Sequence, residues 1–184
     1  MSMKFIKESK IAASPERVFA FHESPGALGR LTPSWEKVKL IEGGTSIRPG
    51  SRTVLKTKLG PFSLKWVAEH TEYEPPHMFA DRQVSGPFAS WRHRHRMIDD
   101  GFGGTILRDE VDYEIPFGFL GRLLGGEAIE AKLQAMFDHR HEKTRRIVEM
   151  EGSAADFQAE KTLDEIGSSR VSSENTVENS SPEM

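Results

Sequence analysis

The chain of 184 residues contains no cysteine. Disulfides, zinc–thiolate centres, iron–sulfur clusters and cysteine nucleophiles all require thiol groups, so all four are excluded. The sequence also lacks an apolar run long enough to cross a bilayer. Its first residues, Met1–Phe5, lack the apolar core of a signal peptide. We therefore expect a cytoplasmic protein without a membrane span.

The net charge is small and unevenly distributed. It is −3 overall, but residues 153–184 carry seven acids and two bases, so the rest of the chain is slightly basic. Neither part has the concentrated Lys and Arg of a nucleic-acid-binding protein, and we expect no nucleic-acid partner. We predict one domain over residues 1–152 and an acidic, Ser-rich, disordered tail over residues 153–184.

The chain does contain a regular succession of strand-like segments and turn signals. Ser14 followed by Pro15 predicts the N-cap and first turn of a short helix, just after a strand at residues 4–12. A second short helix is expected at residues 27–31, and a long amphipathic helix at residues 127–150. Six further strands are predicted between Pro- and Gly-containing breaks, at residues 35–42, 51–58, 62–73, 78–84, 90–98 and 105–115.

This order of elements indicates the fold class. Strands at short spacing without helices between them pair in an antiparallel way. We predict an α+β fold, in which a curved seven-stranded antiparallel sheet wraps around a long C-terminal helix and two short helices follow the first strand. One helix covers only part of such a sheet, so a space remains between them, lined by inward side chains.

The sixth and seventh predicted strands place unusual residues on the inner face. Trp91, His93 and His95 alternate with arginines at every second position, as in a half-buried strand. Asp109, on the next strand, shares its face with Leu107 and Val111. Burying imidazoles and a carboxylate in a dry core costs free energy, so these residues indicate a cavity for a ligand.

Two stretches of sequence and the order of the elements resemble the START-like, or SRPBCC, superfamily over residues 3–150. The stretches are Ile11-Ala-Ala-Ser14-Pro15-Glu-Arg-Val18-Phe19 and Gly86-Pro87-Phe88 with Trp91-Arg-His93-Arg-His95 and Asp109-Glu-Val111-Asp-Tyr113. The second is similar to a bacterial subgroup of ligand-binding and polyketide cyclase-like proteins. The resemblance implies a helix-grip fold with an apolar cavity for lipids, sterols, hormones or polyketides, but it assigns no catalytic residue.

From the strand faces we predict a ligand-binding set that is partly aromatic and partly polar. Its members are Phe21, Trp66, Phe79, Asp81, Gln83, Trp91, His93, His95, Asp109, Tyr113 and Phe117. Simple core packing is the alternative role of the aromatic members. We place Asp81 and Gln83 inward because the opposite face of their strand would bury Arg82, at a higher cost.

His93 and His95 also raise the question of a metal. Two residues apart on one strand, their Cα atoms lie about 6.5–7 Å apart. Such a pair chelates a metal when a carboxylate converges on it, and Asp81 and Asp109 are the candidates. Since the sequence specifies only the pair, we expect a polar pocket lining or a buried hydrogen-bond network, with no metal and no cofactor.

The function predicted first is the binding of a small hydrophobic molecule, oriented by polar residues at one end. The second hypothesis is a cyclase, hydratase or hydrolase, in which Asp109 with His93 or His95 is the general acid–base pair. The third is a protein-interaction module. The apolar loop at residues 117–124 fits either a gate for the ligand or a homodimer patch. We expect His141, with its neighbours His139 and Arg145-Arg146, on the exposed side of the last helix.

Overall fold

The computed structural model describes residues 2–59, 62–116 and 126–151. Met1–Val148 form one compact unit, and Glu149–Met184 form a second, of which only the first three residues are described. Two predictions, the disordered tail at 153–184 and the apolar loop at 117–124, lie outside the described residues.

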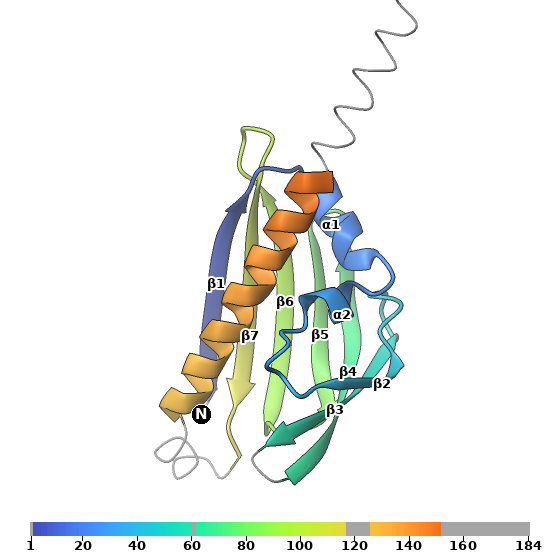
Figure 1. The fold of residues 1–184 in the computed structure, drawn as a ribbon, viewed down its shortest axis with the longest axis vertical. Coiled ribbons are helices and arrows are strands. Elements are labelled where there is room, and N and C mark those ends of the chain that lie inside the picture. Colours follow the sequence, from blue (N-terminus) through green and yellow to red (C-terminus); the bar gives the residue numbers. More distant parts are fainter. Residues whose placement is uncertain (1, 60–61, 117–125, 152–184) are drawn as a thin grey trace, which may run out of the picture. The chain divides into compact units, whose positions relative to one another are not determined.

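Seven strands form one antiparallel sheet in the order β1-β7-β6-β5-β4-β3-β2 (Figure 1). Strands β2 to β7 are joined as a meander, and β1 pairs with β7. The bounds are β1 Met3–Ile11, β2 Lys39–Gly43, β3 Arg52–Leu59, β4 Phe62–Glu74, β5 Met78–Ser85, β6 Ser90–Asp99 and β7 Thr105–Glu114. The predicted seven-stranded α+β fold is confirmed.

Two short helices follow β1. They are α1, Pro15–Glu23, and α2, Ala27–Leu31. Ser14 is the N-cap of α1, and its hydroxyl accepts a hydrogen bond from the backbone N–H of Arg17 at 3.5 Å. This contact satisfies one of the free donors of the first turn, as the Ser-Pro pair predicts.

A long helix runs over residues 126–151, and its part within the first unit, up to Val148, covers part of the inner face of the sheet (Figure 1). Its side chains Leu133 and Phe137 pack with Trp91 of β6 and Val111 of β7. They belong to one of two hydrophobic clusters in the core.

A polar belt separates this cluster from a second hydrophobic cluster. The second cluster contains Met97 of β6 and Leu107 of β7, together with Phe19 of α1 and Val148 of the long helix. Along β6 and β7, the residues between the two clusters on the same face are His93, His95 and Asp109. The period-two pattern therefore continues through the core but changes from apolar to polar in the middle.

One predicted strand is shorter than expected. The prediction covered residues 35–42, whereas β2 begins at Lys39. Trp35 stands before the strand, 57% exposed, with its ring 4.9 Å from the ring of His139 on the long helix. The segment thus leaves the sheet to reach that helix. Among the described helices, none combines the length and the apolar character needed to cross a membrane.

Candidate functional site

A cavity of ≈ 460 Å³ lies between the inner face of the sheet, the short helices and the long helix. This volume falls within the range of about 300–1,000 Å³ that is typical of small-molecule sites. Its lining is mostly apolar and includes Leu31 of α2, Leu55 of β3, Leu64 and Ala68 of β4, and Ile129, Leu133 and Met136 of the long helix.

Aromatic rings from both hydrophobic clusters form part of the cavity wall. The ring of Trp66 lies 5.2 Å from that of Trp91 and 5.7 Å from that of Phe88, both edge-on. Phe79 stacks on His95 with ring centroids 4.1 Å apart. Edge-on and stacked pairs are favourable arrangements of aromatic quadrupoles, so this wall is held in place by its own packing.

Polar groups gather where β5, β6 and β7 cross the middle of the cavity. The register pairs Asp81 with His93 and His95 with Asp109 across neighbouring strands. All four residues line the cavity. Because cross-strand partners point to the same face, two carboxylates and two imidazoles meet on adjacent strands.

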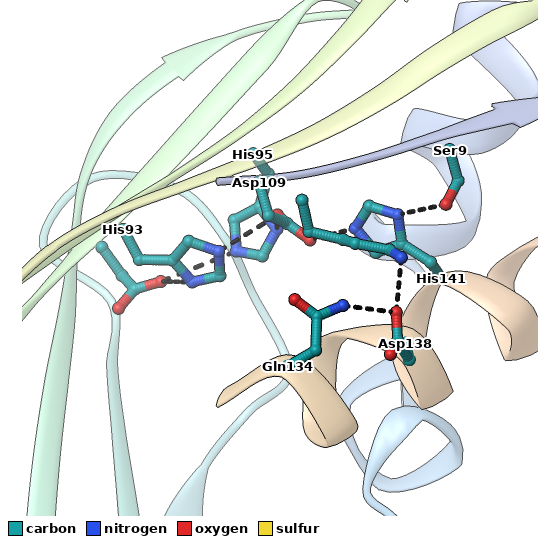
Figure 2. Close-up of polar contacts among 9 residues, drawn as sticks. Ser9, His93, His95, Asp109, Gln134, Asp138 and His141 are labelled. Carbon is teal, nitrogen blue, oxygen red and sulfur yellow. Dashed lines mark hydrogen bonds and ion pairs between the residues drawn. The ribbon is translucent and has the colours of Figure 1, made fainter. Parts of the chain in front are cut away.

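Asp109 is the centre of this cluster (Figure 2). Its Oδ1 lies 3.0 Å from Nε2 of His93 and 2.7 Å from Nδ1 of His95. The contact with His95 is a close ion-pair approach without the alignment of a hydrogen bond. The Oδ2 atom lies 2.7 Å from Nε2 of His141, whose Nδ1 is 2.9 Å from the hydroxyl of Ser9. Three imidazoles therefore surround one buried carboxylate.

Asp81 approaches the same two histidines from the other side. Its Oδ2 lies 3.5 Å from Nδ1 of His93 and 3.7 Å from Nε2 of His95. Each of these two imidazoles is thus placed between two carboxylates. Asp81, His93 and His95 each bring one potential ligand atom within 4.8 Å of the others, a grouping that could hold a metal ion.

The cluster shifts the protonation of its members. Burial opposes the charged form of His93, but the imidazole donates a hydrogen bond to Asp109 and lies close to the carboxylate of Asp81, and together these contacts outweigh burial and raise the pKa of His93 to about 9. Burial likewise disfavours the ionised form of both carboxyls, yet the neighbouring imidazoles hold the pKa of Asp81 and of Asp109 below the usual range. At neutral pH the belt therefore contains two carboxylates and an imidazolium on His93.

Polar atoms without partners face the cavity from the helices. Among the described residues, Nε2 of His22, Nε of Arg140 and Oγ1 of Thr144 are buried without a hydrogen-bond partner, and all three residues line the cavity. Burial lowers the pKa of His22 to about 3 and also lowers the pKa of Arg140, although Asp109 and Asp81 act in the opposite direction on Arg140. Buried polar groups are normally paired, so these atoms indicate a place for a polar group of a ligand.

The structure places most of the predicted ligand-binding set around the cavity. The lining members are Trp66, Phe79, Asp81, Trp91, His93, His95 and Asp109. Phe21 and Tyr113 are buried but are absent from the lining, and Phe117 lies outside the described residues. Gln83 is also absent from the lining, because its amide bonds the backbone of Phe88 across the β5–β6 turn.

The prediction for His141 was wrong. This residue is 2% exposed and inside the cluster. The signal was present in the sequence, since His141 follows Phe137 by four positions and so lies on the buried face of the long helix. His22 and Arg140 were missed as well. Their cavity positions depend on packing between α1, the long helix and the sheet, which no local pattern encodes.

Comparison with solved structures supports the fold. Norcoclaurine synthase from Thalictrum flavum matches with a TM-score of 0.65 and 13% identity, over 83% of this chain and 97% of that chain. The Zhui aromatase/cyclase from Streptomyces sp. R1128 matches with a TM-score of 0.61 and 15% identity, over 81% and 94%. A nucleoside-diphosphate sugar epimerase from Corynebacterium glutamicum matches at 24% identity and a TM-score of 0.65, over 83% of this chain but only 30% of that chain.

At these identities the structural matches show a shared fold and leave the activity open. No curated protein sequence matches the chain. The sequence model of one family, described as "Polyketide cyclase / dehydrase and lipid transport", matches residues 11–137. That match runs from the end of β1 into the long helix and includes most of the cavity lining, and the chain therefore belongs to this family of polyketide cyclases, dehydrases and lipid-transport proteins.

Proposed function

We propose that the protein binds a small, largely apolar molecule in this cavity and directs an acidic oxygen of that molecule toward Arg140. The proposal rests on the lack of an acidic partner for Arg140. Its side chain is partly buried at the cavity, its Nε atom is buried without a hydrogen-bond partner, and in the described part of the chain no ion pair joins the guanidinium to a carboxylate.

The ligand class follows from the two kinds of lining. Apolar walls supply affinity through the burial of apolar surface, at roughly 25 cal/mol per Å². A buried guanidinium without an acid partner is costly, and a carboxylate of the ligand would provide two parallel hydrogen bonds to it. His22 and Thr144, which also line the cavity, offer further hydrogen bonds. Lipid-like and polyketide-like acids combine both features, in agreement with the family.

Binding is better supported than acid–base catalysis. Both oxygens of Asp109 already face imidazoles, His93 and His95 on one side and His141 on the other. A general base must reach the proton that it removes. Asp109 is therefore placed to hold the histidines rather than to take a proton from a substrate.

The experiment uses matched ligands. Trp66 and Trp91 line the cavity, so their fluorescence reports occupancy when the full chain is titrated with dodecanoate or with dodecanol. Dodecanoate should bind about 10- to 100-fold more tightly, because a hydrogen bond to a charged group is worth about 1.5–3 kcal/mol. Native mass spectrometry of the freshly purified protein, followed by solvent extraction, identifies any molecule retained from the cell.

Arg140→Met provides the decisive variant, since it keeps the length of the side chain and removes the charge. It should abolish the preference for the acid and leave dodecanol binding unchanged. Arg146→Met is the control, because Arg146 is exposed and pairs with Glu142. Failure of the wild type to bind either compound, or equal affinity for both, would contradict the proposal.

A further inference from the structure

We propose that Asp81, His93 and His95 form a binding site for one divalent first-row transition-metal cation, for which Zn²⁺ is the probe. The sequence predicted no metal, because it specified two ligands and left the third open. The register of β5 and β6 supplies the third ligand by pairing Asp81 with His93. This inference is independent of the proposed function, because it concerns a cation site that forms with or without an organic ligand.

The first support is the spacing of the ligand atoms. Oδ2 of Asp81 lies 3.5 Å from Nδ1 of His93 and 3.7 Å from Nε2 of His95. These separations are long for hydrogen bonds, which cluster at about 2.7–3.2 Å. They are close to the separation of about 3.3–3.5 Å between two atoms that each lie about 2.0–2.1 Å from a tetrahedral ion. Two of the three separations thus match those around a bound cation, and all three atoms lie within 4.8 Å of one another.

The second support is the contact that each of the two histidines makes with Asp109 through its other ring nitrogen. Each histidine turns its other ring nitrogen toward Oδ1 of Asp109, at 3.0 Å for His93 and 2.7 Å for His95. Metal-binding histidines almost always direct the second nitrogen at a carboxylate or carbonyl, which fixes the tautomer and the ring orientation. Asp109 is itself held by His141, and His141 by Ser9 (Figure 2). A hydrogen bond in the core thus orients His93, and stacking on Phe79 with the close approach to Asp109 holds the ring of His95.

The third support is access. The side chains of Asp81, His93 and His95 are 15%, 4% and 13% exposed, so the cluster is not a chance gathering on the surface. All three residues line the cavity. Two histidines and one carboxylate leave at least one coordination position open, as in metal sites that bind a substrate or a water molecule. An oxygen of a cavity ligand can reach that position.

The test is metal binding by the untagged full chain after EDTA treatment and dialysis. One equivalent of Zn²⁺ should displace the proton that the imidazolium of His93 carries at neutral pH and should bind with a dissociation constant of about 1 μM or less, measured by calorimetry with a competing chelator. Co²⁺ should give the visible bands of a four- or five-coordinate ion, and X-ray absorption of the Zn²⁺ form should show two imidazoles with oxygen neighbours. None of these measurements depends on an activity.

The variants separate the site from adventitious binding. Loss of a residue that merely supports a metal ligand weakens metal binding by about 10- to 100-fold. Asp81→Asn and His95→Gln each remove a ligand, so each should weaken Zn²⁺ binding by more than that. His77→Ala is the matched control, since His77 is an exposed histidine at the β4–β5 turn, and it should bind as the wild type does. Circular dichroism shows whether each variant is folded.

Two outcomes would overturn the inference. One is wild-type binding weaker than about 1 mM. The other is equal affinity in the wild type and in a folded Asp81→Asn variant. Because Asp81→Asn changes a single atom of the side chain, it tests the site even where a histidine variant does not fold. Dodecanoate binding is measured separately in the presence of EDTA, so failure of the metal site and failure of the ligand proposal are distinguishable.

Discussion

Oδ2 of Asp109 lies 2.7 Å from Nε2 of His141, although the two residues are 32 positions apart in the chain. Asp109 belongs to β7, and His141 belongs to the long helix. Both side chains are buried, and the imidazole also contacts Ser9 of β1 at 2.9 Å. A single histidine therefore joins the helix to two strands through polar contacts in the middle of the core.

Replacement of His141 by Phe should destabilise the protein. The ring keeps its bulk, but Oδ2 of Asp109 loses the donor that compensates its burial. We expect the free energy of unfolding to fall by about 2–4 kcal/mol, between the cost of an unsatisfied polar group and that of a broken buried ion pair. Urea denaturation measures this change. His77→Phe, at an exposed position, should change stability by less than about 0.5 kcal/mol, and a similarly small effect of His141→Phe would contradict the role assigned to His141.

Asp109→Asn should lower stability further. Among the described residues, Asp109 is the only carboxylate that contacts all three imidazoles, and the substitution removes it. An amide of the same size cannot balance the positive charge on His93. Breaking a buried ion pair costs about 3–5 kcal/mol, and we expect a loss of stability in this range by urea denaturation. Asp112→Asn on the outer face of β7 is the control, because its pairs with Lys4 and Arg94 are partly exposed and worth at most about 1 kcal/mol. Equal effects of the two substitutions would show that Asp109 has no special place in the core.

The strands of this site were predictable from local sequence because burial in a sheet alternates with a fixed period. His93, His95 and Asp109 appear on the inner face as expected, and the cost of burying Arg82 correctly placed Asp81 with them. Gln83 shares that face, but it lies at the turn, where its amide caps the backbone instead of reaching the cavity. Position along a strand therefore matters as much as the face.

The contribution of the helices was not predictable in the same way. His141 was predicted to be exposed because histidine is polar, whereas its spacing of four residues from Phe137 places it on the buried face of the helix. The family resemblance correctly predicted a cavity between sheet and helix. It did not predict Arg140 or His22, since the position of a polar side chain at the cavity depends on how separate elements pack.

Arg140→Met tests the cost of the unpaired guanidinium in the ligand-free protein. Burial without a carboxylate partner is unfavourable, and burial is also the cause of its lowered pKa. We therefore expect the free energy of unfolding to stay unchanged or to rise by about 1 kcal/mol, while affinity for dodecanoate falls. Urea denaturation of protein stripped of bound ligand is the measurement. A loss of more than about 1 kcal/mol, compared with no change in Arg146→Met, would indicate that Arg140 already has an acidic partner.

His22 should make stability depend on pH in acid solution. Burial lowers its pKa to about 3 in the folded protein, against about 6.5 in the unfolded chain. Above pH 6.5 the side chain is neutral in both states and contributes no pH dependence. As the pH falls below 6.5, the unfolded chain takes up a proton that the folded protein does not, so stability declines by up to about 1.4 kcal/mol per pH unit until about pH 3.

The comparison of the wild type with His22→Gln isolates this contribution. The charged and titratable groups that face His22 are His95, Asp109, His141 and Arg140, and they remain in both proteins. In buffers containing EDTA, the wild type should lose about 2 kcal/mol more than the variant between pH 7 and pH 5, measured by urea denaturation. Equal losses of stability in the two proteins would mean that the folded state accommodates a charged imidazole at position 22. The cavity beside His22 would then be open to water, and the unpartnered Nε2 atom would not indicate a place for a polar group of the ligand.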